Sequence, residues 1–260
     1  MSSTTKVTKL QSGVQINAVI SHPPACAQHS DLPTPTPGPS LVPLAATAYH
    51  TIGLDFRAWG ASSSLDDKGA HPIAALADDT EEVMAALNIK NVVLVGLSMG
   101  AKVGQLLAAR MSSETSNSGR AVTLRGLVLV SPTPPTPLVL PADIREQQLH
   151  AYDSEDSAEF VARNILTSTF QSRNLPSFVV SDMLRGSKWA TKAWPTYAMT
   201  EDVSGAVTRV AVPVLILAAA EDAVEPLGRV QVEVCSRFPG ARLEVLDGCG
   251  HLLNDSGLKG

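Results

Sequence analysis

Val92-Val93-Leu94-Val95-Gly96-Leu97-Ser98-Met99-Gly100 is the stretch of sequence that decides the fold. An apolar run leads directly into a G-x-S-x-G pattern, and a helix-like stretch from Ala101 to Arg110 follows. This order of strand, tight turn and helix is typical of a nucleophile elbow, which holds a serine hydroxyl exposed at the end of a buried strand. The glycines remove Cβ atoms where the backbone is strained and where the helix start crowds the strand. The sequence therefore predicts that Ser98 is a nucleophile.

Outward from this stretch, strand-like and helix-like segments alternate along the chain. Several short apolar runs are nearly continuous, which is typical of parallel strands covered on both faces. We expect such strands at residues 91–95, 124–130, 212–217 and 243–246, and helices at 72–87 and 101–111. Near the N-terminus we expect a β-hairpin joined around Ser12-Gly13, and then a strand at 50–56. The alternation indicates the α/β class, with a mostly parallel sheet, helices on both faces and right-handed crossovers.

Two segments interrupt the alternation. Residues 22–40 are rich in proline, which cannot supply a regular hydrogen-bond ladder, and a short helix is expected after them at 41–49. Residues 131–200 show helical segments and no evident strand. We interpret this insertion as a lid over the carboxyl edge of the sheet, where open α/β sheets bind ligands. The chain is therefore divided into an α/β core at 1–133 and 201–260 and a helical lid at 134–200.

Several charged side chains are interpreted as facing away from the core. Helical spacing over 72–87 places four acids on the outer face, namely Asp78, Asp79, Glu81 and Glu82. Lys102, on the helix that follows the elbow, is expected to be a solvated or lid-facing charge.

A serine nucleophile needs a base, and the base needs an acid that orients it. His251 ends the glycine-rich stretch Gly248-Cys249-Gly250-His251, just past the last expected strand. Asp222 comes just after the strand at 212–217, and Glu221 and Glu225 are alternatives for the acid. The chain order of serine, acid and histidine is the one expected for a hydrolase with this elbow.

Together these features resemble the α/β-hydrolase fold superfamily, in particular its lid-bearing esterase, enol-lactonase and non-haem haloperoxidase-like group. The resemblance runs from about Leu41 to His251. It includes Asp55-Phe56-Arg57-Ala58-Trp59-Gly60-Ala61-Ser62, which is similar to the D-x-R-G-x-G-x-S turn of that family, with Ala58 in place of a glycine. A serine at the elbow, where some relatives carry aspartate, implies acyl chemistry on an ester, thioester or lactone.

The resemblance also implies a mechanism and a set of roles. His251 takes the proton from Ser98 Oγ as it attacks the carbonyl carbon, and Asp222 holds the imidazole in the required tautomer. The Met99 N–H donates to the oxyanion, and water then releases the acyl group. No cofactor or metal is expected, and the expected partner is a small-molecule ester or lactone.

The chain departs from the family pattern in two places. A strand that ends in His-Gly, and whose following loop supplies the second oxyanion N–H, is absent where residues 22–40 lie. Only a short tail follows His251, whereas relatives continue into a closing helix. We therefore expect an incomplete or altered sheet, in either a shortened form of a longer protein or a divergent protein. Losing one oxyanion donor would lower the rate by about two to three orders of magnitude.

Composition limits the remaining possibilities. The chain has 260 residues, 44% of them hydrophobic and 17% charged, which is typical of a well-cored globular protein. A net charge of −5 without a basic run argues against nucleic acid as a partner. The N-terminus lacks an apolar leader and the apolar runs are strand-sized, so we expect a cytoplasmic protein without a membrane partner. Three widely spaced cysteines argue against a disulfide framework.

The leading hypothesis is thus a serine hydrolase of small esters, thioesters or lactones. One alternative is a non-catalytic or weakly active ligand-binding protein on the same fold, and the family departures favour it. A lesser alternative is a haloperoxidase-like perhydrolase, which would use the same triad with peroxide in place of water. The oligomeric state is left open.

Overall fold

The computed structural model describes residues 2–22, 49–63, 65, 67–113, 122–167, 175–207 and 210–253. Its chain forms two compact units, Met1–Leu65 and Asp66–Gly260. The predicted helix at 41–49 and nearly all of the proline-rich stretch at 22–40 lie outside the described residues. The predicted division into core and lid stays a prediction.

The first unit contains a three-stranded antiparallel sheet of order β1-β2-β3. The strands are β1 (Ser2–Lys9), β2 (Gln15–His22) and β3 (Thr51–Leu54). The hairpin between β1 and β2 turns where it was predicted, with Gly13 at a φ of +85° and the Leu10 N–H bonded to the Val14 carbonyl at 2.8 Å. A residue without a Cβ adopts this left-handed conformation at no steric cost.

After β3, the chain makes a tight turn around the carboxylate of Asp55. This group accepts hydrogen bonds from Asn17 Nδ2 and from the Ala61 N–H, both at 2.9 Å. A Cβ on Gly60 would come within 2.4 Å of the same carboxylate, so only glycine fits there. Ala58 has a φ of +65°, a conformation that favours glycine, and it occupies the position where the family resemblance places one.

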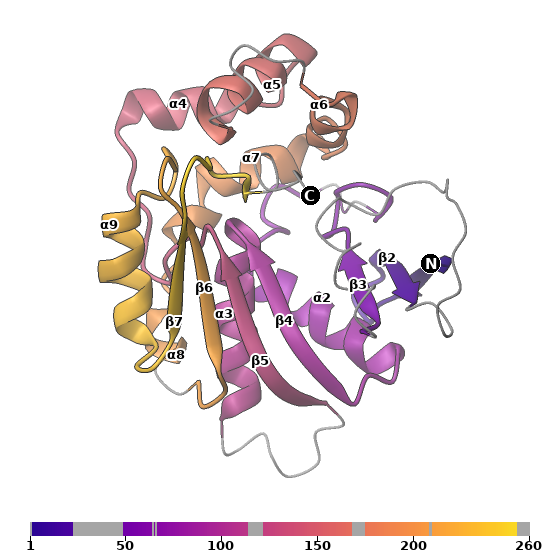
Figure 1. Ribbon diagram of the computed structural model, residues 1–260. Coiled ribbons are helices and arrows are strands. Elements are labelled where there is room, and N and C mark those ends of the chain that lie inside the picture. The colour runs from indigo at the N-terminus through magenta and orange to yellow at the C-terminus, as the bar shows by residue number, and fades with distance from the viewer. Residues whose placement is uncertain are drawn as a thin grey trace, which may run out of the picture. The chain divides into compact units, whose positions relative to one another are not determined.

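The second unit contains a four-stranded parallel sheet of order β4-β5-β6-β7. Its strands are β4 (Asn91–Leu97), β5 (Thr123–Val130), β6 (Val214–Ala219) and β7 (Arg242–Leu246). All four were predicted, and the parallel pairing confirms the α/β class. Figure 1 shows their arrowheads at one edge of the sheet, so the loops that follow the strands meet there.

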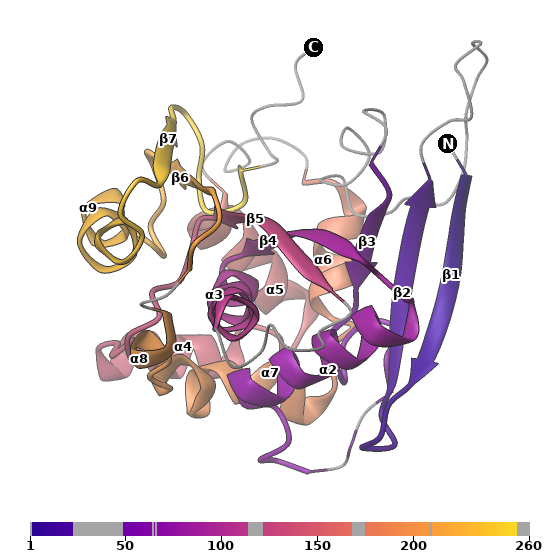
Figure 2. The ribbon, with the colours of Figure 1, turned by 90° about the horizontal axis from the view of Figure 1, so that it is seen from below.

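Two helices cover one face of this sheet: α2 (Ile73–Ala86) and α3 (Met99–Ser112). α3 packs against β4 and β5, and α2 packs against α3 (Figure 2). The core beneath α3 includes Leu127, Leu129 and Ile216, each no more than 1% exposed. The placement of Asp79 on the outer face was wrong, because this residue is only 3% exposed and lies among the buried residues of α2.

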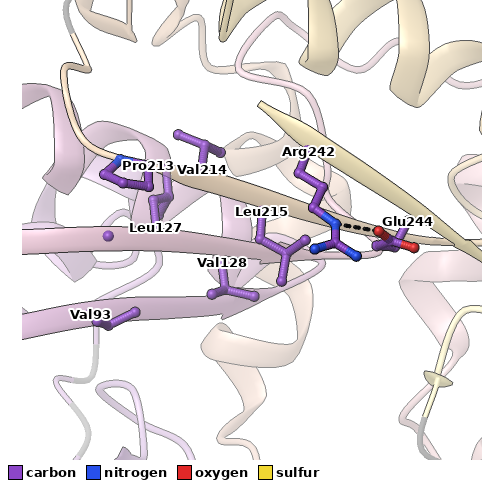
Figure 3. A pocket seen from close by; sticks show the side chains of 9 residues that line it. Val93, Leu127, Val128, Pro213, Val214, Leu215, Arg242 and Glu244 are labelled. Carbon is purple, nitrogen blue, oxygen red and sulfur yellow. Dashed lines mark hydrogen bonds and ion pairs between the residues drawn. The ribbon is translucent and has the colours of Figure 1, made fainter. Parts of the chain in front are cut away.

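The opposite face of the sheet is apolar and much more open. On β4, Val93 is 46% exposed and Val95 is 51% exposed. Figure 3 shows Val93, Val128 and Leu215 on neighbouring strands around a hollow of about 470 Å³, beside the ion pair of Arg242 and Glu244. This hollow is lined by the bodies of the strands and not by the residues that follow their carboxyl ends.

Short helices fill the connection between β5 and β6, as the sequence predicted. They are α4 (Ala142–His150), α5 (Glu155–Val161), the π-helix η2 (Ala162–Leu166), α6 (Ser177–Met183), α7 (Lys188–Thr196), the 3-10 helix η3 (Ala198–Thr200) and α8 (Ser204–Val207). In Figure 1, α4 to α7 lie beyond the arrowhead ends of the strands.

The connection between β6 and β7 is also helical. It consists of α9 (Leu227–Arg229), η4 (Val230–Val234) and η5 (Cys235–Arg237). Within the described ranges, every helix is too short or too polar to cross a membrane.

Candidate active site

Ser98 occupies the sharp turn between β4 and α3. Its φ of +53° and ψ of −120° are strained for a residue with a side chain, and its neighbours hold it in place. The Ser98 N–H donates to the Val130 carbonyl of β5 at 3.0 Å, and the Ser98 carbonyl accepts from the Ala101 N–H at 2.9 Å. Ser98 is half-buried, so part of it is open to solvent.

The glycines of the motif have a direct structural reason. A Cβ on Gly96 would lie 2.4 Å from the Gly100 carbonyl oxygen and 2.7 Å from Ala101 Cα. Both of these are backbone atoms, so no side-chain rotation could relieve the contact. The close approach of β4 and the start of α3 therefore requires glycine at position 96.

Asp222 and His251 come together from the loops that follow β6 and β7. His251 Nδ1 lies 2.9 Å from Asp222 Oδ2 and 3.0 Å from Asp222 Oδ1. The two residues are only 3% and 6% exposed. A carboxylate accepts at this distance, so Nδ1 carries the hydrogen, and Nε2 is left as the proton acceptor of the neutral ring.

Backbone contacts fix the loop that carries the acid. Asp222 Oδ1 also accepts from the N–H groups of Val224 and Glu225, each at 2.8 Å. The Glu221 N–H donates to the Cys249 carbonyl at 3.0 Å, which ties this loop to the one that carries His251. Of the three acids considered from the sequence, Asp222 is the one whose carboxylate bonds to the histidine.

Ser98 and His251 are both tied to the segment that follows β5. The Thr133 N–H donates to the Ser98 carbonyl at 3.4 Å, and Ser131 Oγ donates to the His251 carbonyl at 2.8 Å. No hydrogen bond between Ser98 Oγ and His251 is present among the described residues. The structure thus joins the acid to the histidine directly, and connects the serine to them through residues 130–133.

Met99 is the first residue of α3, so its N–H belongs to the first helical turn. The first N–H groups of a helix have no intrahelical acceptor, and together with the helix dipole they favour an anion beside Ser98. The segment at 23–48, where the family pattern would place a second donor, lies outside the described residues. The predicted donor role of Met99 stays a prediction.

Lys102 is one turn beyond the elbow on α3 and is fully buried. Its Nζ donates to the carbonyls of Thr136 and Met199, at 3.1 and 3.2 Å, which lie at the two ends of the helical connection. Burial lowers the pKa of this ammonium to about 8, although the carboxylates of Glu201 and Asp202 oppose the shift. Of the two alternatives expected for Lys102, this burial excludes the solvated one, and its two acceptors lie in the segment 134–200 that was interpreted as a lid.

Glu225 is a second buried charge that the sequence did not identify as such. It is 1% exposed, and burial raises the pKa of its carboxyl group to about 7, with Arg229 acting in the opposite direction. The signal was available, because Glu225 lies among apolar residues in Ala223-Val224-Glu225-Pro226-Leu227. Over the described ranges, no cluster of three or more metal-ligating side chains occurs.

Residues 30–257 match the model of the Alpha/beta hydrolase family. No curated protein matches the sequence. Solved structures do resemble it, among them an esterase from Exiguobacterium antarcticum, with a TM-score of 0.75, 20% identity, and coverage of 95% of this chain and 92% of that one.

Two further structures share the fold at a similar distance. A bromoperoxidase from Bacillus anthracis has a TM-score of 0.74 and 19% identity, covering 95% of this chain and 93% of its own. The enol-lactonase from Burkholderia xenovorans LB400 has a TM-score of 0.72 and 18% identity, covering 95% and 92%. At such identities the likeness shows the fold and leaves the reaction to be argued from the site.

Proposed function

The chain belongs to the alpha/beta hydrolase family, and from this premise we propose that it is a serine hydrolase of small carboxylic esters, thioesters or lactones. Ser98 is the proposed nucleophile, His251 the base and Asp222 the orienting acid. The observation that carries the proposal is the buried pair of His251 Nδ1 and Asp222 Oδ2 at 2.9 Å, at the same sheet edge as a strained serine. Esterase and enol-lactonase structures with this fold support it.

The proposed first step is acylation. Ser98 Oγ attacks the carbonyl carbon while His251 Nε2 removes the hydroxyl proton, and the carbonyl oxygen becomes an oxyanion near the Met99 N–H. The imidazolium then gives its proton to the leaving alcohol, thiol or, in a lactone, the ring oxygen. Asp222 stabilises the imidazolium and fixes its tautomer, and general base catalysis of this kind contributes about 10²- to 10⁴-fold.

The second step returns the enzyme to its starting state. Water attacks the acyl carbon of Ser98 while His251 Nε2 takes a proton from the water. Collapse of the tetrahedral intermediate breaks the bond to Ser98 Oγ, which recovers its proton from His251, and the carboxylic acid leaves. No cofactor takes part in either step.

A fluorophosphonate probe tests the nucleophile. We expect labelling of the purified chain and hydrolysis of p-nitrophenyl acetate, and we expect both to be lost in Ser98→Ala. Ser112→Ala, at the opposite end of α3, is the matched control and should be labelled like the parent. Absence of labelling in folded parent protein, or equal labelling of Ser98→Ala, would contradict the proposal.

A non-catalytic ligand-binding protein is the second candidate. It is favoured by the lack of a hydrogen bond between Ser98 Oγ and His251 among the described residues. In that case calorimetry would show a small ester binding to the parent and to His251→Ala with equal affinity, without turnover. A haloperoxidase-like perhydrolase is the third candidate, and the similarity to a bromoperoxidase structure favours testing it. Halogenation of monochlorodimedone in the presence of acetate and hydrogen peroxide would reveal this activity.

A further inference from the structure

Glu225 is a buried carboxyl group that the proposed reaction does not use. It is 1% exposed, and neither carboxylate oxygen has a hydrogen-bond partner among the described residues. Burying such a group without a hydrogen bond costs about 1–3 kcal/mol, and more if it is charged, so its presence needs an explanation. The residue lies three positions after Asp222, in the loop that carries the proposed acid.

The groups that face Glu225 come from several elements. Arg229 of α9 is the nearest cation, with its guanidinium NH1 3.5 Å from Glu225 Oε2. Arg229 also contacts Glu233 of η4 at 3.3 Å, and Glu233 accepts a hydrogen bond from Thr136 Oγ1 at 2.6 Å. The ammonium of Lys102, on α3, is close enough to interact electrostatically with Glu225.

The same carboxyl group also interacts with the proposed catalytic pair. The charges of both His251 and Asp222 act on it, the first lowering its pKa and the second raising it. A hydrogen bond reinforces this electrostatic interaction, because the Glu225 N–H donates to Asp222 Oδ1 at 2.8 Å. A change in the position of Glu225 therefore also moves Asp222 Oδ1, which lies 3.0 Å from His251 Nδ1.

We propose that Glu225 is a positioning residue: anchored by Arg229, it holds the Asp222 loop against His251, and its gain or loss of a proton changes the basicity of His251. This inference rests on the proposed function, since it gives that reaction a second controlling group. When Glu225 is neutral, Asp222 alone stabilises the imidazolium. When Glu225 is ionised, a second negative charge favours the imidazolium, and His251 becomes the stronger base.

The burial that raises the pKa of Glu225 to about 7 places this change within the pH range of most assays. Two groups that influence each other titrate as a coupled pair, and each shows the ionisation of the other. The imidazole of His251 therefore reports the state of Glu225. The chemical shifts of this imidazole should change with an inflection near pH 7, where Glu225 gains or loses its proton.

The test is an NMR titration of the His251 imidazole in the Ser98→Ala variant, which is independent of turnover. We expect an inflection near pH 7, from the ionisation of Glu225. Adding Glu225→Gln, which has the shape of the neutral acid, should remove that inflection. Adding Arg229→Gln instead should move the inflection to higher pH, because the guanidinium lowers the pKa of Glu225.

The outcomes separate this inference from the proposed function. If the inflection near pH 7 is missing in the parent, or if Glu225→Gln leaves it unchanged, the positioning role is overturned, even if Ser98 is labelled and active. An inflection near pH 7 that Glu225→Gln removes supports the role, even if the parent hydrolyses no ester. If Glu225→Gln fails to fold, an unmoved inflection in Arg229→Gln overturns the proposal.

Discussion

Two non-glycine residues with positive φ show how differently a strained backbone is used in this chain. Ser98 has a φ of +53° at the elbow between β4 and α3. Ala58 has a φ of +65° in the turn after β3, where its side chain is 4% exposed. Strain at the first position serves the proposed chemistry, whereas at the second it is a cost that glycine would remove.

Replacing Ala58 tests this interpretation. A left-handed conformation costs a non-glycine residue about 1–2 kcal/mol, which offsets the added chain entropy and lost methyl burial of an alanine-to-glycine change. We therefore expect Ala58→Gly to leave the free energy of unfolding unchanged or to raise it by up to about 1 kcal/mol. Urea unfolding followed by circular dichroism measures the difference.

Ala18→Gly is the matched control for that substitution. Ala18 is fully buried in the central strand β2 of the same unit, where the backbone is regular. Glycine in a strand interior costs about 0.5–1 kcal/mol in backbone entropy, and more with the lost methyl group. Equal destabilisation by the two substitutions would mean that Ala58 is not strained.

At the scale of elements, the contact between β4 and α3 depends on one missing side chain. Gly96→Ala would push a Cβ to 2.4 Å from the Gly100 carbonyl oxygen, so the strand and helix would have to separate. We expect a loss of about 1–3 kcal/mol of stability, as for other overpacked sites, together with loss of fluorophosphonate labelling at Ser98. Thermal unfolding and labelling of the same sample check both effects.

Gly104→Ala provides the comparison on the same helix. There the added Cβ would lie 3.7 Å from Leu127 Cδ1, which is ordinary van der Waals contact. Alanine also has a better helix propensity than glycine by about 1 kcal/mol, so this variant should be as stable as the parent or more stable, with normal labelling. A Gly104→Ala variant as damaged as Gly96→Ala would show that α3 tolerates no change at all.

The elements themselves were largely predictable from local sequence. The parallel strands and the helices of the second unit follow from apolar runs and helical spacing, because burial on one or both faces imposes those periods. The turn at Ser98 was predictable because glycine is required where backbone segments meet. The joining of Asp222 to His251 was predicted through chain order, which places each residue after a strand of one sheet, and through the family resemblance.

The buried charges could not be predicted in the same way. Asp79 was placed on an outer face and Lys102 was expected to be solvated or lid-facing, because charged residues are mostly exposed, yet both are buried. Lys102 is covered by both ends of the connection between β5 and β6, through Thr136 and Met199. Thr136 and Met199 are more than sixty positions apart, and no local sequence pattern predicts that both contact the same ammonium group.

At the scale of the whole molecule, these charges make stability depend on pH. Lys102 and Glu225 both lie in the second unit, and burial disfavours the charged form of each. The pKa of Lys102 is lowered from 10.5 to about 8, so its contribution to stability is lost as pH falls from 10.5 through 8. The contribution of Glu225 to stability changes with pH in the opposite direction, and over a lower range of pH.

The pKa of Glu225 is raised from 4.5 to about 7, so the folded chain binds more protons than the unfolded chain between these values. Its contribution is therefore fully present below pH 4.5 and is lost as pH rises through 7. Glu225→Gln keeps the neutral shape and cannot ionise, so it should match the parent in stability at pH 4.5. Above pH 8 it should exceed the parent by up to about 3 kcal/mol, since one pKa unit corresponds to about 1.4 kcal/mol.

Urea unfolding of the parent and of Glu225→Gln, at intervals from pH 4.5 to 8.5, measures this difference directly. Groups that titrate identically in both proteins cancel, so only Glu225 and its coupled neighbours contribute to the change with pH. Glu233→Gln is the control, because Glu233 contacts the same Arg229 but is 35% exposed. A difference between parent and Glu225→Gln that stays constant with pH would mean that Glu225 is ionised normally in the folded chain, with water or Arg229 fully compensating its burial.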